Sequence, residues 1–335
     1  MLGLGLVVLT GLAGCGGSGV APSPRPPQQV TMVYESGARP AGPIDGWIWQ
    51  SDVTGRNAER LTPGQSPVLS PDGRFVAFSR YQAKPSMWSA MVMDLNSRAT
   101  RQIFARKGDY AHATSSLTWS PDSSVLALVD EQGITVVDRD TGQIPQTIAS
   151  STYLGTPSFS PDSRQITYAD DASGRVFVAS ATGGDPSPIT MGPHDFGPVW
   201  GPTGIAFARW LAAGKPGDIW LAQANGEGPR RLTHTDAGIQ PVAFSADGLN
   251  LIAQNPASHN GRIWAVDVST GSARDLTGWV GDLFPQGVSR DGTSILVGIG
   301  CGGVPSATGT IEVIPTSGGP ARTITRGPCR ASWNA

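Results

Sequence analysis

Ser70-Pro71-Asp72-Gly73 is the first copy of a four-residue turn that recurs along this chain of 335 residues. The later copies are Ser120-Pro121-Asp122-Ser123, Ser160-Pro161-Asp162-Ser163, Gly201-Pro202-Thr203-Gly204, Ser245-Ala246-Asp247-Gly248 and Ser289-Arg290-Asp291-Gly292. Their third positions fall at residues 72, 122, 162, 203, 247 and 291, which gives steps of 50, 40, 41, 44 and 44 residues. Self-similarity at this period indicates a repeat architecture.

Each turn lies between two short apolar runs. In the first copy, Pro67-Val68-Leu69 precedes the turn and Phe75-Val76-Ala77-Phe78 follows it. Runs of this kind, bounded by Pro, Asp and Gly, predict two strands joined by a hairpin. Proline presets φ, aspartate accepts hydrogen bonds from its own turn, and glycine takes the left-handed position.

A second hairpin follows each first hairpin. Its leading strand is an apolar run that recurs at residues 47–49, 90–93, 134–137, 176–178, 219–221, 263–266 and 311–314. Short returning strands such as Arg231-Leu232-Thr233 close each unit. Four strands in a repeat of about 40 to 45 residues are typical of a propeller blade. Because helical periodicity is absent beyond the N-terminus, we predict an all-β chain.

The two ends of the chain determine the expected number of blades. The sequence has seven second hairpins but six turns of the first kind. Val30-Thr31-Met32-Val33-Tyr34 matches the strand after a turn, and Arg330-Ala331-Ser332-Trp333 matches the strand before one. Pairing them would close the ring and remove exposed edges. We therefore predict one β-propeller over residues 30–335 with seven blades, six being the alternative.

The block from Asp218-Ile219-Trp220 through Arg231-Leu232-Thr233 to Ser245-Ala246-Asp247-Gly248 resembles the WD-like propeller repeat of the TolB family. A similar repeat occurs in the propeller domains of prolyl-oligopeptidase-type peptidases. The resemblance covers about residues 30–335 and implies the fold. TolB propellers usually have six blades, so the expected seven depart from that family. Repeats of this type serve many unrelated tasks, so the resemblance implies no particular function.

Composition excludes some classes of partner. The net charge is −2 and the two signs are interspersed, so no basic face suggests nucleic acid. We expect a monomer. Three basic residues are lysines (Lys84, Lys107 and Lys215) and the other 21 are arginines. We attribute that bias to genome composition rather than to a partner site.

The N-terminus predicts export and anchoring. Residues 1–14 form a short apolar signal peptide that ends in Leu12-Ala13-Gly14 before Cys15. This ending resembles a bacterial lipobox, which implies lipidation of Cys15 and an extracytoplasmic protein anchored to the cell membrane. Residues 15–29 then read as a Pro/Gly/Ser tether. The usual Lys or Arg near the start is absent, and a plain secretory signal or a short buried apolar run are the alternatives.

Two further cysteines remain, Cys301 and Cys329. In an oxidising envelope compartment they could form a disulfide that clamps the ring closure. The alternative is a pair of free or buried thiols.

Motifs that carry catalysis are missing. The sequence has no Gly-x-Ser-x-Gly elbow, phosphate-binding glycine loop, Cys-x-x-Cys pair or His-Glu-x-x-His. The repeated aspartates belong to hairpin turns one blade apart, so we assign them a structural role. The tryptophans of the second hairpins (Trp47, Trp49, Trp88, Trp220 and Trp264) are assigned to packing between blades. We predict no catalytic residue, metal ligand or cofactor.

One constellation is a candidate binding site. His112, His194 and His234 lie in segments that join blades, and His259 lies in a loop between second and third strands. Both kinds of segment emerge on one face of a propeller, around the channel mouth. The same loops contain Asp109, Asp195, Asp236, Asp282, Tyr153, Trp210 and Trp279. Such a funnel could bind a small ligand, a peptide or a metal.

Three functional hypotheses follow. The leading one is a non-catalytic envelope scaffold that binds a protein, peptide or glycan partner. The second is a lyase or hydrolase acting on peptide or sugar with His and Asp at the channel mouth. The third is a structural element of a larger envelope complex.

Overall fold

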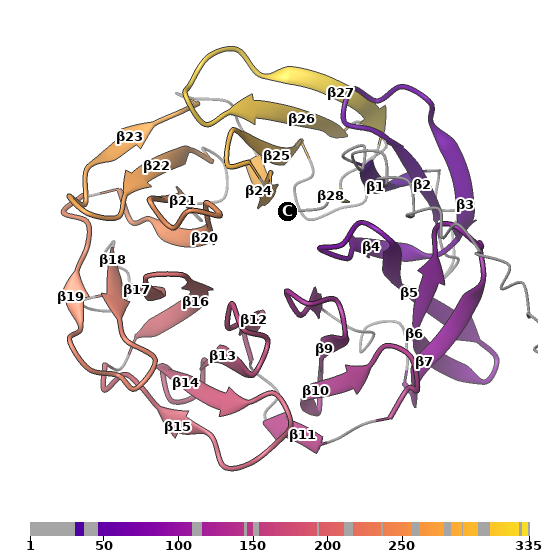
Figure 1. The fold of residues 1–335 in the computed structure, drawn as a ribbon, viewed down its shortest axis with the longest axis horizontal. Helices are drawn as coiled ribbons and strands as arrows, with labels where there is room; N and C mark the ends of the chain where they lie inside the picture. Colours follow the sequence, from indigo (N-terminus) through magenta and orange to yellow (C-terminus); the bar gives the residue numbers. More distant parts are fainter. Residues whose placement is uncertain are drawn as a thin grey trace, which may run out of the picture.

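The computed structural model describes residues 31–36, 46–108, 116–143, 146–149, 154–192, 194–210, 217–235, 237–255, 261–277, 283–289, 291–300, 309–327 and 330–333. These residues form seven four-stranded antiparallel sheets arranged as a closed ring (Figure 1). The predicted seven-bladed, all-β propeller is confirmed. Within these ranges no helix is long and apolar enough to cross a membrane.

In each blade the first strand lies at the central channel and the fourth at the rim (Figure 1). Blade 1 contains β28 (Ala331–Trp333), β1 (Thr31–Ser36), β2 (Trp47–Asp52) and β3 (Glu59–Pro63). Blade 2 contains β4 (Gln65–Leu69), β5 (Phe75–Ala83), β6 (Ser86–Asp94) and β7 (Thr100–Lys107). Blade 3 contains β8 (Ser116–Trp119), β9 (Val125–Asp130), β10 (Gly133–Asp138) and β11 (Gln146–Ala149). Blade 4 contains β12 (Ser158–Phe159), β13 (Gln165–Asp170), β14 (Arg175–Ser180) and β15 (Ser187–Pro188).

The remaining three blades follow the same order. Blade 5 contains β16 (Asp195–Gly201), β17 (Gly204–Arg209), β18 (Asp218–Ala222) and β19 (Arg230–Arg231). Blade 6 contains β20 (Gln240–Phe244), β21 (Asn250–Gln254), β22 (Ile263–Asp267) and β23 (Ala273–Asp275). Blade 7 contains β24 (Leu283–Val288), β25 (Ser294–Ile299), β26 (Gly309–Pro315) and β27 (Arg322–Gly327). The first strands of the seven blades surround the central channel, and the fourth strands lie at the rim (Figure 1).

Blade 1 closes the ring by combining both ends of the chain. β28 pairs with β1 in the register Met32↔Trp333, Val33↔Ser332 and Tyr34↔Ala331. The predicted pairing of the terminal strands is therefore confirmed. The Ser332 hydroxyl also accepts a hydrogen bond from the backbone N–H of Leu69 in blade 2, at 3.0 Å. The closing strand is thus bonded to the next blade as well as to its own.

The recurring turn is held by its own serine and aspartate. In blade 2 the Ser70 hydroxyl donates to Asp72 Oδ1 at 2.5 Å and accepts from the Phe75 N–H at 2.9 Å. The same pair of bonds recurs in the turns that begin at Ser120, Ser160, Ser245 and Ser289. Because each carboxylate is engaged in its turn, the structure supports the structural role assigned to these aspartates.

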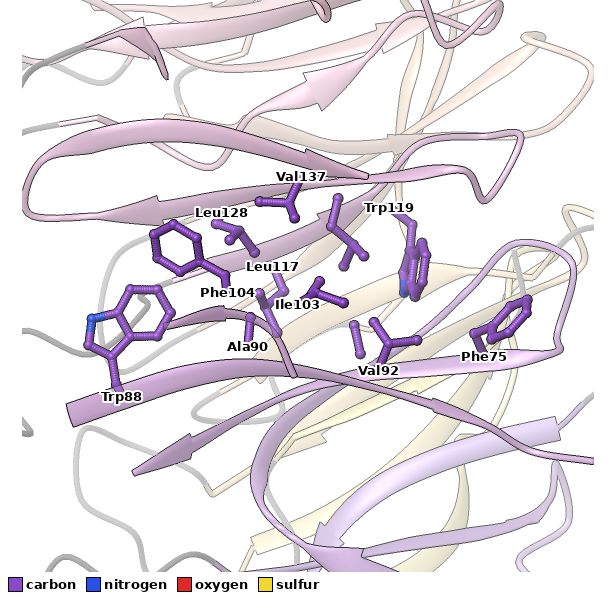
Figure 2. Packing of buried hydrophobic residues seen from close by; sticks show 12 residues of the cluster. Phe75, Trp88, Ala90, Val92, Ile103, Phe104, Leu117, Trp119, Leu128 and Val137 are labelled. Carbon is purple, nitrogen blue, oxygen red and sulfur yellow. The ribbon is translucent and has the colours of Figure 1, made fainter. Parts of the chain in front are cut away.

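The interfaces between blades are packed with apolar side chains. Between blades 2 and 3, Phe75 lies beside Trp119 at one end of the cluster and Trp88 packs on Phe104 at the other (Figure 2). Trp88 and Trp264 are buried, as expected of packing residues. Trp47 differs from that expectation. It is exposed, with the Arg60 guanidinium 4.2 Å from its ring centroid.

Arginines of the outermost strands bind the next blade. They donate to carbonyl oxygens in the turn between that blade's third and fourth strands. The pairs are Arg101 with Arg139 and Asp140, Arg230 with Val268, Arg274 with Thr316 and Ser317, and Arg322 with Val53. A planar guanidinium can donate two such bonds at once, which an ammonium group does less well. At these positions the structure gives arginine a local role in addition to any bias of composition.

The antiparallel order of each blade defines two faces. The first-to-second and third-to-fourth turns emerge on one face, which we call the turn face. The second-to-third loops and the connections between blades emerge on the opposite face, which we call the loop face. Of the predicted constellation, the described members His194, Asp195, Trp210 and His234 belong to the loop face.

Candidate functional site

The loop-face edge of blade 5 contains a row of charged residues. Asp195 opens β16, Arg209 ends β17 and Asp218 opens β18, and the sheet register pairs Asp195 with Arg209 and Arg209 with Asp218. The three residues therefore lie side by side across one edge. Together with His194, Trp210, Arg231, Thr233, His234 and Thr235 they form what we call the blade-5 polar edge.

Asp195 is buried and fully engaged. Its two carboxylate oxygens accept hydrogen bonds from Arg209, from Nε at 2.7 Å and from Nη2 at 2.9 Å. Arg209 in turn packs over the Trp220 ring, 4.5 Å from its centroid. Gly192 makes this arrangement possible, because a Cβ there would lie 2.7 Å from Asp195 Oδ2. A residue expected in a loop is thus the first residue of a strand.

Asp218 forms a second buried ion pair beside the first. Its Oδ2 accepts from Arg231 Nε at 2.9 Å and also from Arg231 Nη2. Its Oδ1 accepts from the Thr233 hydroxyl at 3.0 Å and from the Thr235 N–H at 2.8 Å. Both aspartates are therefore occupied by partners within the blade. Every carboxylate oxygen of the two residues thus accepts a hydrogen bond from within this blade.

Two polar atoms of the edge are buried without a hydrogen-bond partner. They are Trp210 Nε1 and Thr235 Oγ1. Trp210 is fixed in place, since its backbone N–H donates to the His194 carbonyl at 3.0 Å and its ring meets Phe196 edge-on at 5.1 Å. Unpaired buried polar atoms are rare in folded proteins, and these two are enclosed by the protein rather than presented on its surface.

The structure places part of the predicted constellation. His194, Asp195, Trp210 and His234 all lie at the blade-5 polar edge, and both histidines are exposed. The other predicted positions fall outside the described residues: His112, His259, Asp109, Asp236, Asp282, Tyr153, Trp279, Cys15, Cys301 and Cys329. Among the residues that are described, no three of His, Cys, Asp and Glu lie close enough to hold a metal ion.

Sequence reasoning missed Arg209, Asp218 and Arg231. In the sequence, Asp218 and Arg231 belong to segments that predict strands. The available signal was a charged residue at the end of an apolar strand, such as Asp218 before Ile219-Trp220. That pattern does not say which charges meet, because the partners are separated by 13 or 14 residues and are joined only by the sheet register.

The loop face also exposes apolar side chains. Among the described residues, the large exposed hydrophobics are Trp47, Met191, Leu249 and Phe284. Trp47 opens β2, Met191 lies in the connection from blade 4 to blade 5, and Phe284 lies near the start of β24, so all three belong to the loop face. Leu249 lies in the turn between β20 and β21 of blade 6, so it belongs to the turn face. Met191 is 79% exposed, and it lies shortly before His194 in the sequence.

Comparison with known proteins places this chain among propellers. No family model matches it. Tol-Pal system protein TolB of Anaeromyxobacter dehalogenans strain 2CP-1 is 30% identical over 102 residues, which is 30% of this chain and 24% of that protein. The TolB of Anaeromyxobacter sp. strain K matches to the same extent. The matched segment thus spans about a quarter of the length of these curated relatives.

Solved structures give a similar result. TolB from Acinetobacter baumannii shares 17% identity with a TM-score of 0.52, over 91% of this chain and 66% of that one. An oligogalacturonate lyase in complex with manganese shares 17% with a TM-score of 0.59, over 89% and 84%. The propeller domain of the Trilobed protease from Pyrococcus furiosus shares 13% with a TM-score of 0.63, over 88% and 96%. The chain is a TolB-like, seven-bladed β-propeller.

Proposed function

We propose that this protein is a non-catalytic scaffold of the bacterial cell envelope that binds a partner on the loop face of its propeller. The observation that carries the proposal is the composition of that face. It exposes Trp47, Met191 and Phe284, whereas both described carboxylates of the blade-5 polar edge are paired with arginines. Aromatic residues and methionine are enriched at protein–protein interfaces relative to the rest of the surface.

Rigidity supports the same proposal. The loop-face ends of blade 5 are tied to one another by the Asp195–Arg209 and Asp218–Arg231 pairs. A surface that is already ordered loses little conformational entropy when a partner binds.

Similarity to TolB supports an envelope location and an envelope protein as partner. We infer that Cys15 carries the lipid anchor and that residues 15–29 act as a tether. Extended Pro-rich chain covers about 3 Å per residue, so this tether could hold the propeller roughly 40 Å from a membrane. Substitution of Cys15 by Ala should release the protein into the soluble envelope fraction. Unchanged retention of the C15A variant in washed membranes would disprove the anchor.

Crosslinking and mass spectrometry on native membranes test the binding face. Met191→Glu and Phe284→Glu should each reduce the partners captured by the wild-type protein, because a carboxylate replaces exposed apolar surface. Leu249→Glu is the matched control, since Leu249 is also exposed but lies on the turn face. Equal capture by all three variants would reject the loop face as the binding surface.

An enzyme of the envelope is the second candidate. One observation favours it, namely the structural similarity to an oligogalacturonate lyase in complex with manganese. The direct test is to incubate the full chain with oligogalacturonate, with and without manganese, and to follow the unsaturated product. We expect no turnover. Turnover that is lost in His194→Ala and His234→Ala variants would replace the scaffold proposal with the lyase.

A further inference from the structure

Blade 2 carries an excess of positive charge. Residues 65–108 include seven basic side chains and two acidic ones, a net charge of +5 in a chain whose net charge is −2. The basic residues are Arg74, Arg80, Lys84, Arg98, Arg101, Arg106 and Lys107, and the acidic ones are Asp72 and Asp94. The balanced composition of the whole chain therefore conceals one basic blade. Its capacity to attract a partner depends on which of these charges are already neutralised.

Four of the seven basic residues are compensated by carboxylates. The pairs are Arg74 with Asp94 of the same blade, Arg98 with Glu59 of blade 1, and Arg101 with Asp140 and Arg106 with Asp130 of blade 3. The last pair is the most enclosed, since the Asp130 side chain is 2% exposed. These four arginines therefore bind blade 2 within itself and to its neighbours, and they add little net charge to its surface.

The other three cations meet no carboxylate among the described residues. Arg80 donates to neutral oxygens of blade 1, from Nη2 to the Thr62 hydroxyl at 2.9 Å and to the Pro63 carbonyl at 3.0 Å. Lys84 and Lys107 are exposed, and neither takes part in an ion pair of the described part of the chain. These two are also two of the three lysines in the sequence.

All three unpaired cations lie where blade 2 projects from the loop face. β5 and β6 form nine register pairs, whereas the equivalent strands of blade 3 form six. Phe75 and Val125 begin the second strands at equivalent places, because each donates its N–H to its turn serine. The three additional pairs therefore extend the loop-face end of blade 2 by about 10 Å. We call residues 80–88 and 105–107 the blade-2 flap.

The side of the flap toward blade 3 is closed. Trp88 is 1% exposed and packs on Phe104, with ring centroids 5.2 Å apart (Figure 2 shows both rings). The register pairs Trp88 with Arg106, whose guanidinium reaches Asp130 of blade 3. Apolar packing and a buried ion pair occupy this side, so they leave no open surface for a partner there.

The side toward blade 1 carries the unpaired charges. Side chains alternate along a strand and cross-strand partners share a side, so Met87 and its register partner Lys107 lie opposite Trp88. Arg80 is on the same side, since its guanidinium reaches blade 1. Lys84 lies in the exposed turn at the tip. Three positive charges thus surround the half-buried Met87.

Blade 1 does not neutralise this side of the flap. Among its described residues, Glu35 is the carboxylate at the loop-face end of β1, and its Oε2 accepts a hydrogen bond from the Ser66 N–H at 3.0 Å. One engaged carboxylate against three cations leaves the surface positive. A ligand for it should therefore be anionic.

The spacing of the charges fits an extended acidic chain. Arg80 is on β5 and Lys107 is on β7, with β6 between them, so their backbones are about 10 Å apart laterally. Lys84 lies beyond the last additional pair, about 10 Å from the level of Arg80. An extended peptide advances about 3.4 Å per residue, so carboxylates at every third position match these separations. An aliphatic residue between two carboxylates would then meet Met87.

A membrane surface and a nucleic acid fit the flap less well. Its tip, residues 82–85, exposes one cation and no large apolar side chain. Arg80 and Lys107 lie on the flank, where a flat bilayer that touches the tip does not reach them. Single-stranded nucleic acids stack their bases on aromatic rings, but Tyr81 and Trp88 of the flap pack in the cluster shared with blade 3.

We propose that the blade-2 flap binds an acidic, extended segment of a protein partner on its side toward blade 1. Carboxylates of the segment pair with Lys84, Lys107 and Arg80, and an aliphatic side chain contacts Met87. The inference rests on the proposed loop-face function and names the chemistry of one part of the partner. Complementary charge of this kind accelerates encounter and fixes the register of binding.

Fluorescence anisotropy of labelled peptides with the full chain tests the proposal. The probe is a peptide of three Asp-Ala-Leu repeats, and its control has Asn in place of every Asp. We expect the acidic probe to bind at low ionic strength and to bind more weakly as salt is added, because the Debye length falls from about 30 Å at 0.01 M to about 10 Å at 0.1 M. No binding of the acidic probe, or equal binding of the Asn control, would overturn the proposal.

Charge reversal locates the binding site. The double variant Lys84→Glu with Lys107→Glu should weaken binding of the acidic probe at least about fivefold. Both lysines are exposed and unpaired, so the variant should stay folded, which thermal unfolding verifies. The matched control is Arg56→Glu with Arg164→Glu, because these exposed arginines lie on the turn face and the change in net charge is the same. A folded flap variant that binds like wild type, or equal losses in the two double variants, would reject the flap.

Two further measurements separate this inference from its alternatives. Vesicles that contain phosphatidylglycerol should compete poorly with the acidic probe, and tighter binding to vesicles than to the probe would assign the flap to a membrane instead. Crosslinking on native membranes compares the flap variant with Met191→Glu. Wild-type capture by the flap variant, with capture lost in Met191→Glu, would reject the flap and keep the loop-face proposal. The reverse result would reject the apolar part of the loop-face proposal and keep the flap.

Discussion

Arg209 holds Asp195 by two parallel hydrogen bonds, from Nε to Oδ1 at 2.7 Å and from Nη2 to Oδ2 at 2.9 Å. The aspartate side chain is completely buried, and the arginine side chain is 21% exposed. The pair joins the first residue of β16 to the last residue of β17, at the edge where the loop face begins. It orders that edge of the propeller without leaving a carboxylate oxygen free.

Removal of this buried carboxylate should destabilise the propeller. We expect Asp195→Ala to lower the free energy of unfolding by about 2–3 kcal/mol, because the charged Arg209 loses both acceptors. Urea denaturation measures the change. Arg262→Ala is the control, since its bond to Asp275 is 3.2 Å long and both side chains are more exposed, and we expect less than about 1 kcal/mol. Equal effects of the two substitutions would contradict a special role for the buried pair.

Gly271, in the turn between β22 and β23 of blade 6, should tolerate no side chain. Gly271 has φ +74°, and a Cβ there would lie 1.9 Å from the carbonyl oxygen of Leu232 in blade 5. Gly271→Ala should therefore lower the free energy of unfolding by more than the cost of a left-handed backbone alone, which is about 1–2 kcal/mol. Gly228→Ala isolates that backbone cost, because Gly228 has φ +59° and no atom within 4 Å of a Cβ. If thermal unfolding shows that Gly271→Ala and Gly228→Ala lower stability equally, the close contact between Gly271 and Leu232 is not what excludes a side chain at position 271.

The closing strand should contribute strongly to stability. Trp333 is 5% exposed and pairs with Met32 across the junction of the two chain ends. We expect Trp333→Ala to reduce the free energy of unfolding by about 3–5 kcal/mol, the usual range for loss of a buried tryptophan. Trp47→Ala, at an exposed tryptophan of the same blade, is the matched control and should change it little. Faster amide exchange in β1 of the W333A variant would show that the closure opens locally, whereas unaltered exchange there would argue against it.

The carboxyl of Asp267, the last residue of β22 in blade 6, should titrate at low pH. Hydrogen bonds from the Ser269 hydroxyl and from the backbone and hydroxyl of Thr270, together with the Ser269 N–H, lower the pKa of Asp267 to about 2. A carboxyl with a depressed pKa stabilises the fold above its unfolded pKa, and that contribution is lost as the pH falls toward about 2. NMR titration of the Asp267 carboxyl measures the value directly. Ser269→Ala should raise the pKa, because it removes the largest cause of the shift, and an unchanged pKa would refute that cause.

Three of the turn aspartates have a lowered pKa for the same physical reason. Hydrogen bonds from Ser160, Ser245 and Ser289 hold the pKa of Asp162, Asp247 and Asp291 below the usual range. Each is tied to its turn by a serine two residues earlier. The Ser-x-Asp pattern was readable in the sequence because it is local, and local hydrogen bonds need no knowledge of distant residues.

The functional face was only partly predictable. The sequence placed His194, His234 and Trp210 on one face, because strand order alone decides on which face a connection emerges. It did not show that Asp195 is buried against Arg209 or that Arg231 binds Asp218. Those contacts join different strands, and which charges meet depends on the register of the sheet.

The sequence by itself determined the repeat, the four-stranded unit and the closure that joins residues 31–36 to residues 331–333. These features depend on periodicity and turn chemistry, which are properties of neighbouring residues. Only the tertiary structure decided which charges are buried and which tryptophans are exposed. Those properties arise when strands and blades meet, because the partners of a side chain, such as Trp119 beside Phe75, come from distant parts of the sequence.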